Sequence, residues 1–551
     1  MRQDVSKART RKTRTRQKKS APRHRHKSPE ENPAIGLLIA AVVWIAAILL
    51  VGFDDFLDLP MTFDEIMVIS GSSVFALATL FAAGLFIYIA SPETIQSNSK
   101  IGLLASIVLI ALIAARTILY FWGFTDHPHF EIILFLLPFA IVPLMATIML
   151  NSVLAIASGI WAVMIMALMS AQTTSHTADS FFTLLVTGIL VTVIAATTAR
   201  NIKTRSKVLR TASVVGLAEI VCVLGFTALN WHNTDVTLVL HMAGSCILSA
   251  FFSALLVLLI MPALESLFNV ATNITLLELS DLSHPLLQRL ALEAPGTYHH
   301  SLVVANLSQA AADEIGANSL LARVSAYFHD VGKLTKPGLF AENISLHNNP
   351  HDNLSPSMST LVITSHVKEG LSLAMLYKIP VIVRKAIREH HGTSVLSFFH
   401  HKAKEQLELG IEDKKPQASD RRKIDERNFR YTGPKPSDRE SAIICLADAV
   451  EAASRSLEKP TPAHIEDLVD DIVKQRILDG QLDESGLKLS DLACIKRAFV
   501  FTLTNMVHTR IPYPKDENTD KQQPANPKTG QQKIKGTANV PGAKNWNSGR
   551  L

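Results

Sequence analysis

Long apolar stretches in the first half of the chain constrain its fold more than any other feature. Nearly all of them lie before residue 270, whereas most charged residues lie before residue 32 or after residue 275. A helix that crosses a bilayer needs about 20 mostly apolar residues. Eight stretches come close to that length: 35–53, 66–90, 101–123, 130–150, 152–171, 181–199, 209–229 and 237–263. The sequence therefore predicts a helical membrane half followed by a soluble half.

Basic residues in the connecting segments predict the orientation. Residues 1–29 hold twelve lysines and arginines, and the loop at 200–210 holds five more. The loops at 124–129, 172–180 and 230–236 contain none. Cytoplasmic loops are enriched in Lys and Arg, so the first arm and the loop at 200–210 are predicted to be cytoplasmic. With eight crossings, both termini and the soluble half lie in the cytoplasm, as in a multi-pass protein of the inner (cytoplasmic) membrane.

Polar residues within the predicted spans leave alternatives open. Only Asn151 and its neighbours separate the fourth stretch from the fifth, so the two form either a tight helical hairpin or one broken element. Arg116, Glu219 and His241 lie inside apolar stretches, where ionisable side chains are costly and often functional. Such residues can form structural pairs between helices, for example Arg116 with a carboxylate, or can belong to a ligand-sensing site.

The basic arm at residues 1–32 has two interpretations. It can bind nucleic acid, or it can lie against an anionic leaflet, where each nearby cation contributes about 1 kcal/mol. An apolar stretch follows the arm directly, which favours a membrane anchor. We therefore expect the arm to contact anionic lipid of the bilayer, and we expect no specific nucleic-acid partner.

The soluble half is predicted to be helical. Apolar residues recur at three-to-four spacing after residue 275, and strand-like alternation is scarce. The fold class is therefore all-α, with a polytopic α-helical membrane domain followed by an all-helical cytoplasmic domain. The predicted segments are a basic disordered arm (1–32), a first transmembrane helix (33–54), a short extracytoplasmic loop (55–65), a seven-helix membrane domain (66–265), a cytoplasmic domain (266–513) with a polar insertion near 405–437, and a disordered tail (514–551).

The connection between the two halves is also expected to be largely helical. The stretch from Glu265 to Glu293 contains no glycine, and its only proline is Pro285. A helical connection can transmit a shift or rotation, whereas a flexible Gly/Ser-rich linker would not. The alternative without coupling is a tether that only holds the soluble half near the membrane.

Histidine and aspartate residues scattered over the soluble half form a candidate metal site. They are His300, the His329-Asp330 pair, His366, the His390-His391 pair and Asp448, each on or beside a predicted helix. A lone histidine on an apolar helix usually belongs to the core, but packing alone does not account for this set. A carboxylate can bridge two cations because both of its oxygens can coordinate. Mixed imidazole and carboxylate ligands suit iron, manganese or zinc better than calcium or magnesium.

The motifs around these residues resemble those of a known family. HDVGK is the signature of the HD phosphohydrolase superfamily. The longer segments are ELSDLSHPLLQRLALEAPGTYHHSLVVANLSQAAA, ARVSAYFHDVGKLTKPGLFAEN, NPHDNLSP, SHVKEG, EHHGTSVLSFFHHKA and YTGPKPSDRESAIICLADAVEAASRSL. Together they closely resemble the seven-transmembrane HD-domain family, whose PgpH-type members are cyclic-di-AMP phosphodiesterases. The HD resemblance covers residues 275–460, and spans two to eight resemble the seven-helix unit. The family's sizeable extracytoplasmic domain is replaced here by about twelve residues after the first span.

The resemblance implies a site for two divalent transition metals, iron or manganese, in an HD-type phosphohydrolase domain. Carried over motif by motif, the ligands are His300, His329, Asp330, His366, His390, His391 and Asp448, and His299 is left out. Asp330 is then the bridging, catalytic carboxylate. Lys333 resembles the family's phosphate-facing lysine and is the second catalytic candidate, although a solvated surface charge is the alternative.

The implied reaction is metal-assisted hydrolysis of a cyclic dinucleotide to a linear dinucleotide, with Lys333 neutralising charge on the phosphate oxygens. Cyclic-di-AMP is the favoured substrate. Two alternatives stay open. One is the same chemistry on another nucleotide, such as cyclic-di-GMP, a linear dinucleotide or a nucleoside phosphate. The other is a nucleotide-binding signalling receptor without turnover. A homo-oligomer is compatible with the sequence.

Overall fold

A computed structural model of the chain describes residues 33–57, 61–95, 97–122, 131–172, 177–229, 235–344, 349–412, 425–457 and 461–508. The predicted arm at 1–32 and tail at 514–551 lie outside these ranges. Within them, the regular structure is helical, and the one pairing of strand type is an isolated bridge between Val395 and Arg430. The predicted all-α fold class is confirmed.

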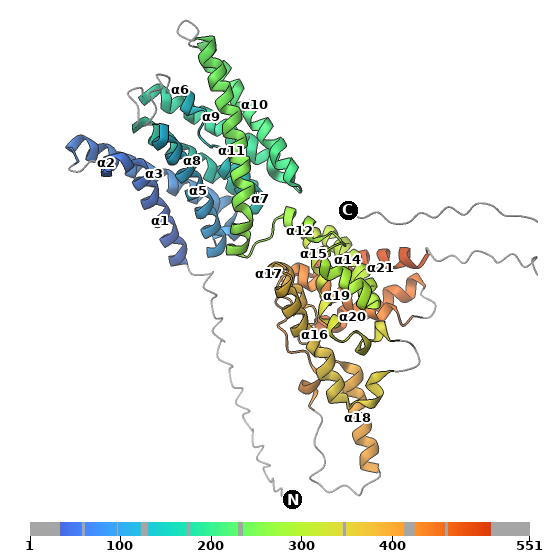
Figure 1. Cartoon of the computed structure of the whole chain (residues 1–551). Coiled ribbons are helices and arrows are strands. Elements are labelled where there is room, and N and C mark those ends of the chain that lie inside the picture. Colours follow the sequence, from blue (N-terminus) through green and yellow to red (C-terminus); the bar gives the residue numbers. More distant parts are fainter. Residues whose placement is uncertain are drawn as a thin grey trace, which may run out of the picture. The chain divides into compact units, whose positions relative to one another are not determined.

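The first half of the described chain consists of long apolar helices (Figure 1). Its elements are α1 (Pro33–Val51), α2 (Phe53–Leu57), α3 (Phe63–Ala90), α4 (Pro92–Ile95), α5 (Asn98–Trp122), α6 (Glu131–Leu134), α7 (Ile141–Met149), α8 (Ser152–Gln172), α9 (Thr177–Thr198), η2 (Ala199–Asn201), α10 (Arg205–Leu229) and α11 (Val236–Phe268). Among the described residues, seven helices are long and apolar enough to cross a membrane, namely α1, α3, α5, α8, α9, α10 and α11. They correspond to all the predicted spans except the fourth.

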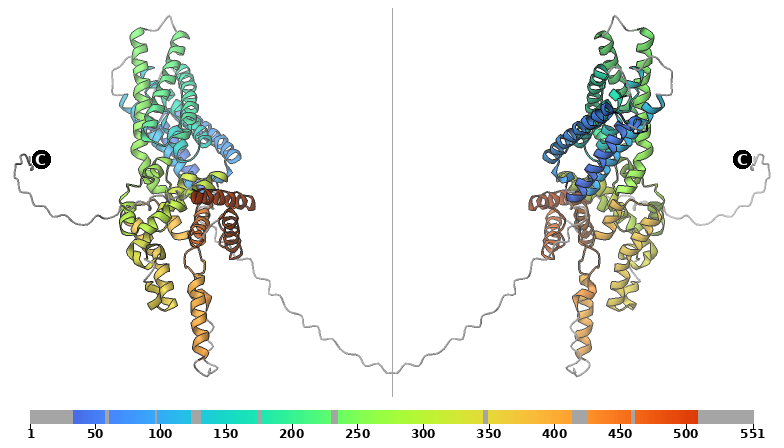
Figure 2. Two further views of the ribbon diagram at one scale, coloured as in Figure 1. Left: turned by 90° about the vertical axis from the view of Figure 1, so that its right-hand side faces the viewer. Right: turned by 90° about the vertical axis from the view of Figure 1, so that its left-hand side faces the viewer.

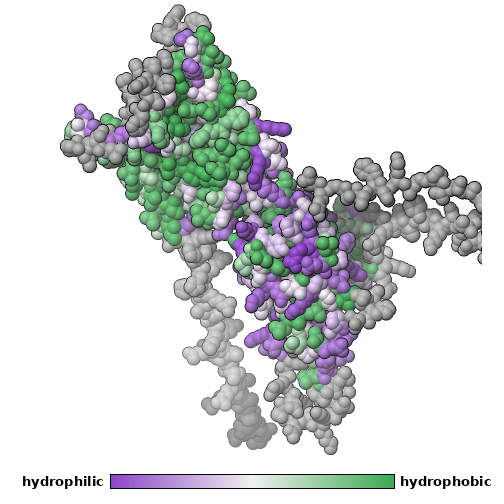
Figure 3. Space-filling model, in the orientation of Figure 1, coloured by the Kyte–Doolittle hydropathy of each residue, from purple (hydrophilic) through white to green (hydrophobic). Residues whose placement is uncertain are grey.

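Large apolar side chains cover the outside of this helical bundle. Leu37, Phe81 and Leu259 are each 73% exposed. A helix that is apolar on every face is stable only where its outer surroundings are apolar as well. Figure 3 shows hydrophobic residues gathered over these helices, whereas hydrophilic residues are frequent over the second half. The outer surface of the first half is therefore suited to lipid.

The fourth predicted span is not a continuous helix. Residues 130–150 contain the two short helices α6 and α7, separated by the non-helical stretch 135–140. Pro138 and Pro143 lack the amide hydrogen that a continuous helix requires. Most side chains of this element are buried, and irregular backbone is tolerated at membrane depth only inside protein. The element is therefore broken, and the expected eight spanning helices are corrected to seven within the described residues.

Contacts between helix ends show how the broken element runs. At one side of the bundle, the Ser99 hydroxyl near the start of α5 donates to the carbonyl of Phe268 at the end of α11, at 3.5 Å. Leu154, near the start of α8, packs with Ile87, near the end of α3. Only a few residues separate α3 from α5, so the starts of α5 and α8 lie on the same side. The broken element consequently returns the chain from the far end of α5 across the bundle.

The three ionisable residues inside the spans have different surroundings. Arg116 on α5 is buried, forms an ion pair with Asp54 of α2, and lies 5.2 Å from the ring centroid of Phe53. This agrees with the interpretation of Arg116 as a member of a structural pair. His241 is exposed on α11, where the neighbouring surface is apolar, whereas Glu219 is buried.

The connection between the halves is helical in separate pieces. α11 ends at Phe268, and Asn269 adopts the left-handed backbone conformation (φ 54°) that asparagine tolerates. The carboxylate of Glu265 accepts hydrogen bonds from the backbone N–H of Thr272 at 2.7 Å and from the hydroxyl of Thr275 at 2.8 Å. The expected helical connection is thus interrupted after α11 and again before α13.

The second half is built of helices and connecting segments (Figures 1 and 2). Its elements are α12 (Asn273–Leu279), α13 (Pro285–Glu293), α14 (Pro295–Glu314), α15 (Ser319–Phe328), η4 (Val331–Thr335), η5 (Pro337–Leu339), η6 (Ala341–Asn343), η7 (Pro350–Asn353), α16 (Pro356–Leu376), α17 (Val381–Glu389), α18 (Ser397–Glu412), η8 (Glu426–Phe429), α19 (Arg439–Ser454), α20 (Pro462–Leu478) and α21 (Leu489–His508). α14, α15 and α19 pack together through fully buried apolar residues such as Val304, Phe328 and Ile443.

The polar insertion expected near 405–437 is narrower in the structure. Residues 405–412 continue α18, and residues 413–424 lie outside the described ranges. From residue 425 onward the chain packs against the rest of this half. Phe429 is buried, and Arg430 forms an ion pair with Asp479 at 2.9 Å.

Candidate metal centre

Seven side chains from five helical regions converge in the second half. His300 comes from α14, His366 from α16 and Asp448 from α19. The pairs His329-Asp330 and His390-His391 directly follow α15 and α17. The structure brings together all of the histidines and aspartates predicted from the sequence. They form two groups that could hold a metal ion, one of His300, His329, Asp330 and Asp448, the other of Asp330, His366, His390 and His391. His299, left out of the prediction, is exposed.

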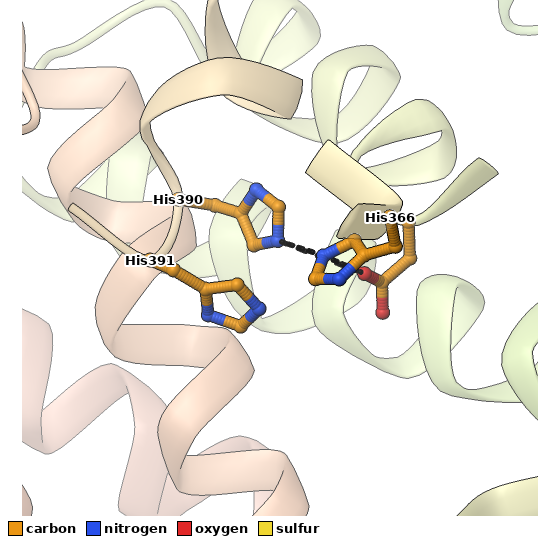
Figure 4. A group of neighbouring side chains, drawn as sticks. His366, His390 and His391 are labelled. Carbon is orange, nitrogen blue, oxygen red and sulfur yellow. Dashed lines mark hydrogen bonds and ion pairs between the residues drawn. The ribbon is translucent and has the colours of Figure 1, made fainter. Parts of the chain in front are cut away.

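Asp330 belongs to both groups because its two oxygens face in different directions. Oδ2 lies 3.5 Å from His300 Nε2 and 3.3 Å from His329 Nε2. Oδ1 lies 3.4 Å from His366 Nε2 and 3.6 Å from His390 Nε2. Figure 4 shows the imidazoles of His366, His390 and His391 directed toward one another. A carboxylate in this position can bind one cation through each oxygen.

Asp448 gives the two groups a second connection. Its Oδ1 lies 3.0 Å from His300 Nε2 and 3.8 Å from His329 Nε2. Its Oδ2 lies 3.4 Å from Nδ1 of His391, which belongs to the other group. Two carboxylates and five imidazoles are thus gathered in one compact cluster.

The chain orients four of the imidazoles through their Nδ1 atoms. His329 donates to the carbonyl of Ala326 at 2.7 Å, His366 to that of Ile363 at 2.6 Å, and His390 to that of Ala386 at 2.9 Å. The Nδ1 atom of His300 is bonded to the carboxylate of Glu451. Such bonds select the tautomer whose Nε2 lone pair is available to a metal.

The unsatisfied atoms of the cluster fit a metal ion. His329 Nε2 and Asp330 Oδ1 are buried without a hydrogen-bond partner among the described residues. Buried polar atoms are normally paired, because leaving one unpaired costs about 1–3 kcal/mol. A cation between the imidazole nitrogens and the carboxylate oxygens would satisfy these atoms. The donor set of nitrogen and oxygen is also the one that transition metals accept.

The pKa values of the cluster favour charged carboxylates, whereas among the imidazoles they are raised at His300 and His329 and lowered at His366 and His391. Burial opposes ionisation of Asp330, but the charges of Lys333 and His329 outweigh it and hold the pKa of Asp330 well below its usual range. Burial, aided by His390, lowers the pKa of His366 to about 4. Burial opposes a charge on His329 as well, yet Asp330 and Asp448 raise the pKa of His329 to about 10. A metal ion that binds there must displace this proton.

Two glycines explain how the motif segments approach so closely. A Cβ atom on Gly332 would lie 1.9 Å from the carbonyl oxygen of His366, so only glycine allows η4 to pack against α16. A Cβ atom on Gly296 would lie 1.9 Å from the carbonyl oxygen of Glu342. The first contact positions His366 beside Asp330, and the second holds the start of α14 against η6.

Lys333 lies next to the cluster and is not a solvated surface charge. Its Nζ atom is 2.7 Å from Asp330 Oδ2 and 2.8 Å from Glu342 Oε1, and its side chain is 13% exposed. Burial disfavours the ammonium, but the charges of Asp330 and Glu342 raise the pKa of Lys333 above its usual range. Thr297 donates to the same Glu342 oxygen at 2.9 Å. Lys333 is therefore a fixed positive charge at the cluster.

A cavity of about 1170 Å³ adjoins the cluster. Its wall includes His300, His366, His391 and Asp448 from the cluster, together with Lys333, the aromatic residues Phe340, Phe398, Phe399 and Tyr431, and the basic residues Arg455 and Arg476. Cavities for drug-sized ligands usually measure about 300–1,000 Å³, so this one has room for a larger molecule. Its mixture of aromatic and cationic groups suits a nucleotide.

Sequence reasoning missed two residues that contact the cluster. Glu451 bonds to His300 and accepts hydrogen bonds from Arg455, at 2.7 Å from Nε. Tyr431 stacks on His391 with ring centroids 4.1 Å apart. Glu451 follows Asp448 by one helical turn, a spacing that the sequence displays. Tyr431 lies within the range expected to be an insertion, although it is also the first residue of the motif segment YTGPKPSDRE, which could have marked it.

Replacing Glu451 with glutamine is expected to weaken metal binding by about 10–100-fold, as is usual when the acceptor behind a metal-bound imidazole is altered. The loss should fall on the group that contains His300, since its Nδ1 atom faces Glu451. Metal titration of the full-length protein against a chelator measures this. Glu440→Gln on the same helix is the matched control, because Glu440 accepts from the backbone N–H of Asn318 at 2.8 Å and is not part of the cluster. Equal affinity in both variants would contradict the role.

Comparisons with known proteins agree with this geometry. Residues 66–272 match the family model described as "7TM receptor with intracellular HD hydrolase", and residues 297–453 match the HD domain. The cyclic-di-AMP phosphodiesterase PgpH of Bacillus subtilis (strain 168) is 42% identical over 315 residues, which are 56% of this chain and 42% of that protein. PgpH of Listeria monocytogenes serotype 1/2a (strain 10403S) is 34% identical over 452 residues, 82% of this chain and 59% of that protein.

A solved structure covers the second half of the chain. The crystal structure of the L. monocytogenes phosphodiesterase PgpH HD domain in complex with cyclic-di-AMP shares 41% sequence identity and covers 41% of this chain and 100% of that chain, with a TM-score of 0.38. The present chain spans about half the length of the curated relatives it matches. Residues 66–272 are therefore similar to the membrane domain of 7TM receptors with an intracellular HD hydrolase, and residues 297–453 are similar to HD domains.

Proposed function

We propose that this chain is a membrane-bound, metal-dependent phosphodiesterase that hydrolyses cyclic-di-AMP to a linear dinucleotide. The observation that carries the proposal is Asp330, whose two oxygens face two separate groups of ligands beside a cavity of about 1170 Å³. The two relatives are named cyclic-di-AMP phosphodiesterases, and the solved HD domain is in complex with cyclic-di-AMP. Site, cavity and relatives therefore support the same substrate class.

The cluster is proposed to hold two iron or manganese ions. His300, His329 and Asp448 would bind one ion, and His366, His390 and His391 the other, with Asp330 shared between them. When bound, such ions supply an activated hydroxide and neutralise charge on the phosphate. The donor set of five imidazoles and two carboxylates favours these metals over calcium and magnesium, which prefer oxygen ligands.

The chain's own residues position the substrate in this proposal. Lys333 offers a fixed ammonium group to a phosphate oxygen, and Glu342 holds that ammonium from the other side. Aromatic side chains of the cavity, including Phe340 and Tyr431, exclude water and provide surfaces on which a base can stack. Preorganised charge in a site protected from water stabilises the charge that develops on the phosphate during hydrolysis.

The test is an activity assay on the full-length protein in lipid nanodiscs. The protein is loaded with manganese or reduced iron and incubated with cyclic-di-AMP, cyclic-di-GMP, linear dinucleotides and nucleoside phosphates. Chromatography should show cyclic-di-AMP converted to a linear dinucleotide faster than any other compound is consumed. Faster turnover of another nucleotide would reassign the substrate. Tight binding of two metals with no turnover of any compound would instead favour a signalling receptor.

Replacing Arg476 with alanine is expected to raise KM for cyclic-di-AMP by about tenfold or more, because hydrogen bonds to charged groups contribute about 1.5–3 kcal/mol. Arg476 lies on α20 and lines the cavity outside the metal cluster, so metal content should not change. Steady-state kinetics and metal analysis separate the two effects. Lys474→Ala removes a charge from an exposed site on the same helix and should leave KM unchanged. A similar KM in both variants would exclude Arg476 from substrate binding.

We also propose that both termini are cytoplasmic and that the broken α6–α7 element crosses the bilayer, which gives eight crossings with seven continuous helices. A fluorescent protein fused after Leu551 should fluoresce, and alkaline phosphatase at the same position should be inactive. Alkaline phosphatase inserted at Ser175, between α8 and α9, should be active. A second alkaline phosphatase insertion at Asp126, between α5 and α6, should also be active, because the broken element and α8 together cross twice. If Asp126 and Ser175 report opposite sides, the broken element does not cross.

A further inference from the structure

The carboxylate of Glu219 is buried in the middle of α10 without a partner. The residue is 1% exposed, and neither of its oxygens has a hydrogen bond or an ion pair among the described residues. An isolated ionised carboxylate in an apolar environment carries a very large solvation penalty. Ionisable residues inside membrane domains are accordingly rare and are usually functional. Glu219 must therefore either bind a proton or share its charge with a cation.

Among the described residues, no basic side chain faces Glu219. On α10, Cys222 lies about one turn away, and α11 brings Cys246 within electrostatic reach of Glu219. From α9, the hydroxyl of Thr187 contacts Cys222. α10 and α11 approach closely at Gly216, where a Cβ atom would lie 3.6 Å from the carbonyl oxygen of Cys246. The titratable neighbours are thus two buried thiols, and no positive charge in the described part of the chain compensates the carboxylate.

The broken element packs on the same face of α11. Ser249, about one turn after Cys246, donates to the carbonyl of Leu137 at 2.7 Å. Leu137 belongs to the non-helical stretch between α6 and α7. The backbone carbonyls of this stretch do not all form the hydrogen bonds of a regular helix. One turn further, the hydroxyl of Ser253 is fully buried and has no partner in the described part of the chain. Carbonyl oxygens from broken helices, hydroxyls and a carboxylate are groups with which transporters coordinate small cations.

We propose that Glu219 is the central ligand of a cation-binding site inside the membrane domain. This site binds a proton or a small monovalent cation. The chemistry of the site is one buried negative charge whose titratable neighbours are the thiols of Cys222 and Cys246. A transition metal does not fit, since the ligand atoms of Glu219, Cys222 and Cys246 do not converge as those of the HD cluster do. A purely structural carboxylate would be expected to have a partner, as Asp54 has in Arg116.

A hydrophobic carbodiimide tests the proposal, because it reacts with protonated carboxyl groups inside membrane domains. The full-length protein in nanodiscs is treated with dicyclohexylcarbodiimide over a pH series, in N-methylglucamine, lithium, sodium or potassium salts. Mass spectrometry then follows the peptide that contains Glu219. Labelling at Glu219 should be at least tenfold faster than at Asp54, whose carboxylate is ion-paired. Glu219→Gln, a neutral variant of nearly the same shape, should lose the label while keeping its melting temperature.

The salts distinguish the two occupants. If one cation protects Glu219 from labelling in proportion to its concentration, that cation is the ligand. If labelling ignores all the salts and falls as pH rises, the ligand is a proton. Absence of labelling at every pH, or labelling that responds to neither pH nor salt, would overturn the proposal. The readout uses no phosphodiesterase activity, so its outcome is independent of the proposed function.

Discussion

Replacing Asp330 with alanine is expected to remove most bound metal and to lower turnover on the order of 1000-fold or more, since altering even an outer partner of a metal ligand costs about 10–100-fold. The effect is large because one side chain serves both groups. Its Oδ2 faces His300 and His329, and its Oδ1 faces His366 and His390. Elemental analysis of the full-length protein and the cyclic-di-AMP assay measure the two losses.

Two further variants make this experiment decisive. Asp330→Asn keeps the size of the side chain but removes its charge, so it should lose metal as well while retaining the fold. Asp352→Ala removes an exposed carboxylate from η7 in the same half and should leave metal content and turnover unchanged. Both metals and a wild-type rate in Asp330→Ala would refute the shared role of this carboxylate.

Replacing Gly332 with alanine is expected to destabilise the second half by about 3 kcal/mol, the upper part of the usual range for overpacking. The new Cβ atom would lie 1.9 Å from the carbonyl oxygen of His366 and 2.5 Å from the amide nitrogen of Gly370. Both are backbone atoms, which cannot rotate away as a flexible side chain can. α16 must therefore move, and His366 moves with it away from Asp330.

Thermal unfolding of the full-length protein and its metal content measure this effect. A loss of about 3 kcal/mol corresponds to a decrease of roughly 6–12 °C in the melting temperature of a domain of this size. Gly338→Ala is the matched control, because a Cβ atom at that nearby glycine meets nothing within 4 Å. A Gly332→Ala variant with the stability and metal content of Gly338→Ala would show that the close approach of η4 and α16 is not required.

In the membrane half, the sequence predicts those spans in which a single continuous helix makes all of its backbone hydrogen bonds within itself. Seven apolar stretches became single helices, because length and apolar composition determine such spans locally. The fourth stretch has a similar composition but forms a broken element. Pro138 and Pro143 are visible in the sequence. Whether prolines kink a helix or interrupt it depends on the neighbours that satisfy the freed backbone, and here those include Ser249, more than 100 residues away.

The metal cluster was predictable as a set of residues but not as an arrangement. Motifs named all seven candidate ligands, since the residue types themselves carry the chemistry. The division into two groups around Asp330 depends on how α14, α16 and α19 approach one another. Tyr431 was missed for the same reason. It reaches His391 from a polar segment, and its burial follows from tertiary contacts such as the ion pair between Arg430 and Asp479.

The length of α11 has a mechanical consequence. Its 33 residues extend about 50 Å at 1.5 Å per residue, whereas the hydrocarbon core of a bilayer is about 30 Å thick. The helix must tilt or protrude, and a change in tilt of roughly 10° about its midpoint displaces its end by about 4 Å. Catalytic side chains tolerate displacements of only about 0.5 Å. The residue with left-handed backbone conformation, Asn269, lies in the chain between α11 and the metal ligands. It can therefore act as a hinge that converts the motion of α11 into a rotation. A change of membrane thickness would then reorient the cavity and alter its accessibility to substrate, while the bond-breaking geometry is preserved.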